Sequence, residues 1–497
     1  MFNRSESFAV ISILLLAAGI LIWGYNRAKP YGKAGLLAWL QSVVLMVPWL
    51  VFFGLFSTGI ALNAIALVGL LVVSAGIYIY LGNRLRAAGQ DSILRDRNPS
   101  PPPTELTATP PSTPEAAPSI APEVLPIPEA DLQEIQKIFG IDTFFATETI
   151  SYQEGAIFKG NLRGEAAEVR DRLADKLAQR FDEKYRLFLV ESPDGKPTIV
   201  ILPSSRDPEP LSLAQKNLAI VLLVCTIATS IEAAALLRGF DWFSELGRYR
   251  EALPIAAGLW TILIAHELGH GFFARKHNVR LSWPFFLPSW QIGSFGALTR
   301  FQSLLPNRSV LFDIALAGPV AGGLVSLVML VVGLILSHPG SLFQLPAQFF
   351  QGSIVVGMLA KVFLGDALKA TTVDVHPLAV LGWLGLVITA LNLMPAGQLD
   401  GGRIVQAIYG RRMARRATIA TLVVLGIIAV AVPGNPIPLY WGFLILFLQR
   451  DLERPSLNEL TEPDDLRASL GLLALFLMLL VLIPLTPALA LRLGIGA

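Results

Sequence analysis

Long apolar runs separated by short polar segments dominate this chain of 497 residues. A helix needs about 20 apolar residues to cross the hydrocarbon core of a bilayer, and fewer if it is tilted or broken. The apolar patch at 354–364 is too short to span and is expected to be re-entrant or interfacial. The pattern predicts an all-α polytopic membrane protein with about ten spans, at residues 8–25, 38–57, 60–81, 214–237, 253–274, 310–336, 377–394, 417–432, 437–448 and 470–489.

Composition and charge agree with a membrane protein. Hydrophobic residues make up 53% of the chain and charged residues 15%, against about 25% charged residues in ordinary soluble domains. Lys and Arg cluster after the first, third, fifth and seventh expected spans, so an outside N-terminus places all of these clusters on the cytoplasmic side. We expect residues 8–25 to be a retained span rather than a cleaved signal peptide.

Two classes of protein are excluded by the sequence. Basic and aromatic residues are not concentrated as on a nucleic-acid-binding surface, so no nucleic acid partner is expected. The single cysteine, Cys225, excludes an internal disulfide framework, and we expect it to be a small packing residue.

Between the third and fourth expected spans the chain changes character. Residues 98–128 are rich in Pro, Thr, Ala and Glu, which is typical of an extended linker. A small cytoplasmic α+β domain is predicted next, at 129–205, because Val169, Leu173, Leu177 and Phe181 mark one face of a helix. A Pro-Asp-Gly-Lys turn then joins two short apolar runs. The predicted order is a βαββ unit, at residues 156–160, 165–181, 187–190 and 198–202.

The fifth expected span carries three ionisable side chains, His266, Glu267 and His270. Two histidines four residues apart share one helix face at about 6 Å, a spacing that lets both imidazoles bind one metal ion. Glu267 lies beside the first histidine, where it can take a proton from water at the metal. A charged group at mid-helix costs about 2.5–3.5 kcal/mol on insertion scales, which argues against a chance match. The donors suit Zn²⁺ with one open position.

A third ligand should come from another span at the same depth. His277 follows the span in a basic cluster, His338 lies in a loop, and His376 opens the seventh span at its outer end, which leaves the acids. Asp400 lies at the inner end of the seventh span, where Pro and Gly residues break the helix and allow its carboxylate to turn inward. An inner-face loop aspartate is the alternative for Asp400. Asp313 is the rival ligand, although a helix-starting or packing role suits it better.

Three motifs together resemble the site-2 protease family of intramembrane zinc metalloproteases. They are His266-Glu-Leu-Gly-His270, Ala317-Gly-Pro-Val-Ala-Gly322 and Asn392 followed by Leu399-Asp-Gly-Gly402. The longer segments 158–164, 293–300, 312–319, 376–378 and 398–403 look most like the chloroplast and cyanobacterial branch named for ethylene-dependent gravitropism-deficient and yellow-green plants.

The resemblance implies a role for each site residue. It implies that His266, His270 and Asp400 ligate zinc and that Glu267 is the general base. It also suggests that Asn392 helps to hold the substrate backbone, although an asparagine there can equally cap a helix or bond to a neighbour.

Two further segments have expected supporting roles. Gly318 and Gly322 have the small-xxx-small spacing that lets helices approach closely. Residues 281–297 are apolar but too rich in Pro and Gly for a span. They are expected to form either a membrane-dipping hairpin whose free edge pairs with an unwound substrate strand or a plain interfacial loop.

We therefore expect a zinc metalloendopeptidase that cleaves transmembrane segments of other membrane proteins within the lipid bilayer. A metal transporter or channel, and a catalytically silent scaffold that binds membrane proteins, are the alternatives. We expect a bacterial plasma or thylakoid membrane, for example a cyanobacterial one. The expected parts are an N-terminal three-span region, a linker, the soluble domain, a catalytic membrane core and C-terminal spans, at 1–97, 98–128, 129–205, 206–410 and 411–497.

Overall fold

The computed structural model describes residues 127–496, except for short gaps, and scattered positions between 21 and 84. The gaps are at 153–154, 193, 212, 290–291, 433–434, 436 and 447–450. The chain divides into two compact units, Met1–Val124 and Leu125–Ala497. In the first unit the short 3₁₀ helix η1 covers Lys29–Tyr31. The three expected N-terminal spans lie largely outside the described residues, as does almost all of the expected linker.

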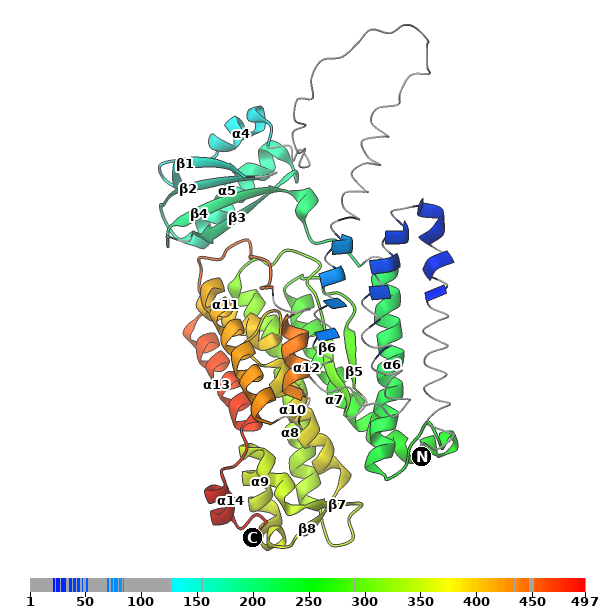
Figure 1. The fold of residues 1–497 in the computed structure, drawn as a ribbon. Helices are drawn as coiled ribbons and strands as arrows, with labels where there is room; N and C mark the ends of the chain where they lie inside the picture. The colour runs from blue at the N-terminus through cyan, green and yellow to red at the C-terminus, as the bar shows by residue number, and fades with distance from the viewer. Residues whose placement is uncertain are drawn as a thin grey trace, which may run out of the picture. The chain divides into compact units, whose positions relative to one another are not determined.

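The second unit is mostly helical (Figure 1). Within the described residues, five helices are long and apolar enough to cross a membrane. They are α6 (Leu213–Leu237), α7 (Tyr249–Lys276), α8 (Arg308–Ile335), α11 (Asp400–Ala431) and α13 (Asp465–Leu482). The apolar helix α10 (Pro377–Asn392) is shorter. The prediction of a polytopic helical membrane protein is confirmed at this coarse level, whereas about ten spans are not.

The expected span at 417–432 does not stand alone, because it continues from the first turns of α11. The helix is interrupted at Gly410, whose φ of 77° and ψ of 173° are not helical. Glycine reaches a positive φ without the steric cost that other residues pay. The α11 helix therefore has two segments, and the first one begins at Asp400.

The last two expected spans correspond to the helices α12 and α13. The ninth overlaps α12 (Ile437–Leu444), and its last expected residues, 447 and 448, lie outside the described residues. The tenth corresponds to α13, which ends at Leu482, ahead of Pro484. Proline cannot donate the backbone hydrogen bond that continues a helix, and the short helix α14 (Pro487–Leu493) follows.

Shorter elements connect the long helices. The patch expected to be too short for a span is the helix α9, and the Pro/Gly-rich segment is an antiparallel hairpin of β5 and β6. A second hairpin pairs β7 with β8. The bounds are β5 (Phe285–Ser289), β6 (Gly293–Leu298), β7 (Phe343–Pro346), β8 (Thr372–Val375), α9 (Ile354–Leu364), η2 (Ser204–Arg206), η3 (Leu246–Arg248), η4 (Ala347–Gly352) and η5 (Gly365–Lys369).

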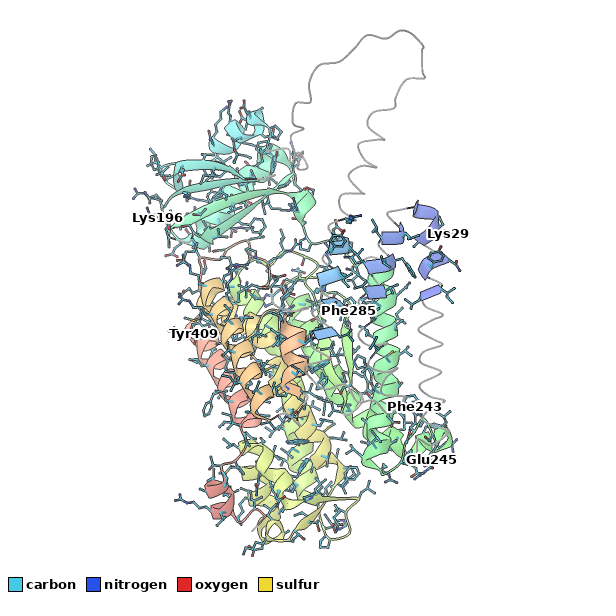
Figure 2. The ribbon with its side chains drawn as sticks, viewed as in Figure 1. Lys29, Lys196, Phe243, Glu245, Phe285 and Tyr409 are labelled. Carbon is cyan, nitrogen blue, oxygen red and sulfur yellow. The ribbon has the colours of Figure 1, made fainter. Side chains whose placement is uncertain are left out.

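Large apolar side chains project outward from the long helices (Figure 2). Several are more than half exposed although they belong to the apolar spans, namely Val224, Leu268, Phe272, Val320, Leu324, Val430 and Leu472. A soluble monomer rarely exposes so large an apolar surface. Contact with lipid accounts for these side chains, and the protein is therefore membrane-associated.

The soluble domain contains a four-stranded antiparallel sheet in the order β1-β2-β4-β3. The elements are α4 (Glu129–Gln136), β1 (Phe144–Tyr152), β2 (Gly155–Leu162), α5 (Ala166–Phe181), β3 (Tyr185–Glu191) and β4 (Pro197–Pro203). Lys196, labelled in Figure 2, lies in the turn between β3 and β4. The expected βαββ unit was therefore incomplete, because it lacked α4 and β1. At the sheet edge, β1 is mostly exposed and correspondingly polar, which weakens its strand signal.

The core of this domain forms between α5 and the sheet. Val169, Leu173 and Leu177 of α5 are buried, as their four-residue spacing predicted, and Phe181 is half-buried. They pack with Phe158 and other apolar residues of the strands.

Replacement of Leu173 by Ala should destabilise the soluble domain by about 2–5 kcal/mol, because it leaves a cavity at a fully buried position. Hydrogen exchange of the β2 and β4 amides in the full-length protein measures this loss. The neighbouring Arg172→Ala is the control, since the Arg172 side chain is 53% exposed. Equal protection in the two variants would contradict the packing described here.

Candidate metal centre

His266 and His270 lie in the C-terminal half of α7 with their rings in contact. Their Nε2 atoms are 3.1 Å apart, and the rings meet edge to face with centroids 4.8 Å apart. Both residues are buried. Two histidines one helical turn apart thus direct two potential ligand nitrogens to the same point.

Asp400 brings a carboxylate to the same point from 130 residues further along the chain. Its Oδ2 lies 3.2 Å from His266 Nε2, and its Oδ1 lies 3.5 Å from His270 Nε2. Asp400 is the first residue of α11, directly after the turn that follows α10. A Cβ on the next residue, Gly401, would lie 1.8 Å from the carbonyl oxygen of Leu393, so only glycine lets the chain fold back this closely.

The three donors fit a zinc ion. Ligand atoms about 2.0–2.1 Å from Zn²⁺ at tetrahedral angles lie about 3.3 Å from one another. The three separations observed are 3.1, 3.2 and 3.5 Å. Two imidazole nitrogens and one carboxylate, with a fourth position open, are also the donor set of many catalytic zinc sites.

A backbone carbonyl fixes the orientation of the His270 ring. Nδ1 of His270 lies 2.7 Å from the carbonyl oxygen of Ile314 in α8. A ring nitrogen that faces a carbonyl carries the proton, which leaves Nε2 free to bind a metal. Sequence reasoning missed this contact, and no residue type could have revealed it, because Ile314 acts through its backbone.

Glycines of α8 make room for the histidines. A Cβ on Gly318 would lie 2.2 Å from His270 Nε2, and a Cβ on Gly322 would lie 3.2 Å from His266 Nδ1. The small residues expected to permit helix packing therefore also leave the space that the two imidazoles occupy.

Glu267 lies beside the three donors. One of its carboxylate oxygens is within 4.8 Å of the ligand nitrogens of both histidines. Glu267, His266, Thr389 and Asn392 line a cavity of about 10 Å³, which is room for about one water molecule. The Glu267 carboxylate, a water-sized space and the candidate ligand His266 are thus adjacent.

Asn392, which also lines this cavity, is the last residue of α10. Its Nδ2 donates to the carbonyl oxygens of Ile388, at 3.0 Å, and of Phe295 in β6, at 3.3 Å. A Cβ on Gly296 would lie 2.7 Å from that nitrogen, so the strand approaches Asn392 closely. The β5–β6 hairpin is therefore held against the candidate site.

The other candidates have different partners. Asp313 accepts hydrogen bonds from Arg467 at 2.7 and 3.0 Å and lies 3.2 Å from His277 Nε2. His277, expected at the surface, is half-buried by this contact. His376 caps the N-terminus of α10, and His338 is exposed. The carboxylate of the rival ligand Asp313 is thus paired with Arg467 and His277.

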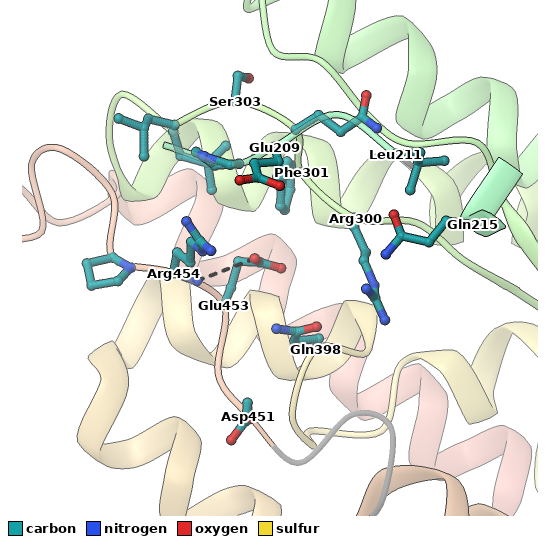
Figure 3. Close-up of a pocket in the computed structure, with 15 residues that line it drawn as sticks. Glu209, Leu211, Gln215, Arg300, Phe301, Ser303, Gln398, Asp451, Glu453 and Arg454 are labelled. Carbon is teal, nitrogen blue, oxygen red and sulfur yellow. Dashed lines mark hydrogen bonds between the residues drawn. The ribbon is translucent and has the colours of Figure 1, made fainter. Parts of the chain in front are cut away.

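A larger cavity of about 350 Å³ lies outside the metal centre (Figure 3). Its lining includes Arg300, Phe301, Gln398 and Glu453, from segments that precede α8, precede α11 and follow α12. The cavity does not include any of the three donors, so the small space beside Glu267 is the better candidate for chemistry. Arg403 lies in the segment 398–403 that carries the resemblance but had no expected role, and its partner Glu453 was not singled out in the sequence.

Comparison with known families gives two matches. Residues 254–432 match the family described as peptidase family M50. Residues 133–210 match the domain described as the EGY3 middle domain, which covers most of the soluble domain. No solved structure matches the chain.

Three curated relatives of this chain are plant proteins. A probable zinc metalloprotease EGY1, chloroplastic, of Arabidopsis thaliana is 38% identical over 405 residues, which is 74% of this chain and 73% of that protein. The probable zinc metalloprotease EGY2 of the same plant is 39% identical over 358 residues, or 70% of this chain and 63% of that protein. A probable zinc metalloprotease EGY3 of rice (Oryza sativa subsp. indica) is 32% identical, and the chain spans 64% of it.

Replacement of Gly318 by Ala should weaken zinc binding at least about ten-fold, because the new methyl group displaces the ligand nitrogen of His270. Competition with a chelator measures the affinity. Gly323→Ala is the matched control on the same helix, since its Cβ would lie an ordinary 3.5 Å from Thr389. Unchanged affinity in Gly318→Ala would show that the ring does not lie where the structure has it.

Proposed function

Because this chain belongs to the site-2 protease family, peptidase family M50, of intramembrane zinc metalloproteases, we propose that His266, His270 and Asp400 hold its zinc ion and that Glu267 is its general base. One observation carries the proposal. Three donor atoms from α7 and α11 converge at 3.1–3.5 Å directly beside the Glu267 carboxylate.

The chemistry follows from this arrangement. When bound, Zn²⁺ polarises the scissile carbonyl and makes a neighbouring water molecule more acidic. Glu267 takes the proton of that water on its carboxylate and later passes a proton to the leaving amine. The contact between His270 Nδ1 and the Ile314 carbonyl keeps the imidazole in the orientation that the reaction needs. Burial of the cluster limits competing water.

The proposed substrate is a transmembrane helix of another protein, locally unwound. A helix protects its carbonyls by its own hydrogen bonds, so a segment must unwind before it can be cleaved. We propose that an edge of the β5–β6 hairpin pairs with the unwound strand and that Asn392 helps to hold the substrate backbone. The hydrogen bond from Asn392 to the carbonyl of Phe295 in β6 places the hairpin beside Asn392, which supports both proposed roles.

The number of membrane spans, the side of the soluble domain and the type of membrane are also part of this proposal. We propose about ten spans with the soluble domain on the cytoplasmic side of a plasma or thylakoid membrane. The relatives reported above are chloroplastic by name, and the comparisons give no support to the expected bacterial origin. They also do not favour a metal transporter, a channel or a silent scaffold, which would have no need for Glu267 beside the metal ligands.

Replacement of Glu267 by Gln should lower the rate of substrate cleavage by about 10²–10⁴-fold, because the amide cannot accept the proton. Zinc content should stay near one ion per chain. Comparison of membrane-protein fragments in cells that carry either form identifies the uncleaved substrate. If no membrane protein accumulates uncut in the variant, the general-base role is wrong.

Replacement of Asp400 by Asn should abolish tight zinc binding, whereas Asp313→Asn should preserve it. The first removes a charged ligand, and the second removes a partner of Arg467 and His277 outside the metal centre. Zinc content after purification and dialysis distinguishes the two acids. Loss of zinc in Asp313→Asn alone would reverse their roles.

A further inference from the structure

Arg403 is a buried cation one turn after Asp400 in α11 and is only 4% exposed. Its Nε and Nη2 lie 3.1 and 3.0 Å from Oε2 of Glu453. Nη2 also donates to the carbonyl oxygen of Thr299 at 2.7 Å, and the guanidinium lies 4.8 Å from the ring centroid of Phe301. One side chain thus joins α11 to the segment after β6 and to the segment after α12.

The backbone of Glu453 is hydrogen-bonded to side chains of α11. Its N–H donates to Oε1 of Gln406 at 3.0 Å, and its carbonyl accepts from Nε2 of Gln406 at 3.2 Å. The same carbonyl accepts from Nη1 of Arg411 at 2.5 Å. Gln406 and Glu453 are both buried. The backbone of Glu453 is therefore held by α11, which places its carboxylate beside the Arg403 guanidinium.

Asp400 is the second carboxylate beside Arg403. Its Oδ1, which lies 3.5 Å from His270 Nε2, is 4.0 Å from Nη1 of Arg403. Among the residues that the structure describes, Glu453 and Asp400 are the two acids within 4.0 Å of this guanidinium. The oxygen of Asp400 therefore has two possible partners, the metal centre and Arg403.

We infer that Glu453 is a positioning residue for the metal centre, which holds the Arg403 guanidinium and so leaves the Asp400 carboxylate directed at His266 and His270. This inference rests on the metal site proposed above. A buried charge that loses its partner is strongly destabilised, and Arg pairs readily with a carboxylate through two parallel hydrogen bonds. Without the charge of Glu453, the nearest carboxylate for Arg403 is the metal ligand.

Glu453 can act on Asp400 because the connector, residues 453–459, is anchored on two sides. The N–H groups of Leu457 and Asn458 donate to the carbonyls of Leu305 and Pro306, ahead of α8, at 2.8 and 3.0 Å. Leu189 of β3 exchanges two hydrogen bonds of 2.9 Å with the connector, one with Leu457 and one with Glu459. Figure 3 shows Glu453 and Arg454 of the connector beside the larger cavity.

The test compares zinc affinity in four forms of the full-length protein in detergent. Glu453→Gln should weaken zinc binding by about 10–100-fold, the usual effect of losing a residue that supports a ligand. The double variant Glu453→Gln/Arg403→Gln should bind zinc within a few-fold of the wild type, because the cation that captures Asp400 is gone. Glu462→Gln is the control, since this acid follows the connector, lies near Arg308 and is 75% exposed.

Two readouts besides proteolysis are used. Chelator competition gives the zinc affinity, and the visible absorption of Co²⁺ in the same site reports whether a carboxylate remains among the ligands. A double variant that binds zinc no better than Glu453→Gln would overturn the inference, because a merely structural role predicts no rescue. Wild-type affinity in Glu453→Gln would overturn it as well.

Folding and the metal site itself are tested separately. If Glu453→Gln does not fold, Glu453→Asp replaces it. That variant keeps the charge and should bind zinc nearly as well as the wild type, while affinity as low as that of Asp400→Asn would overturn the inference. If Asp400→Asn binds zinc like the wild type, the proposed metal site fails. If Asp400→Asn loses zinc and Glu453→Gln binds it like the wild type, the site stands and the inference alone fails.

Discussion

The contact between two imidazoles and a carboxylate inside apolar helices is the constraint on which the rest of this structure depends. Each of these groups is costly in a low-dielectric interior unless it has a partner. His266, His270 and Asp400 are partners for one another at 3.1–3.5 Å. The surrounding helices must then leave space for rigid rings, which explains why α8 presents glycines rather than larger residues toward them.

Much of this centre was predictable because its signals are local. The spacing of His266 and His270 places both rings on one helix face in any α-helix. The Pro and Gly residues around Asp400 indicate a break in the helix, and a carboxylate at a break can point inward. These inferences need only the geometry of one turn or one segment. The helix α5 was predicted for the same reason, from Val169, Leu173 and Leu177.

What the sequence did not reveal depends on distant partners or on the backbone. The role of Ile314 is carried by a carbonyl that every residue has. Glu453 meets Arg403 across 50 residues, and nothing in its neighbourhood distinguishes it from a surface acid. The strand β1 is polar because it lies at a sheet edge. The expected span at 417–432 did not include the first segment of α11, which begins at Asp400.

The pairing of the connector with Leu189 affects how exposed the edge of the sheet in the soluble domain is to other chains. The strand β3 is an edge strand of the sheet. An unpaired edge strand is a template to which other chains can add strands, and this leads to aggregation. The connector pairs with this edge at Leu189. Strand addition at β3 is therefore blocked at Leu189. At the opposite edge, β1, charged and hydroxyl side chains such as Glu148 and Thr149 discourage it.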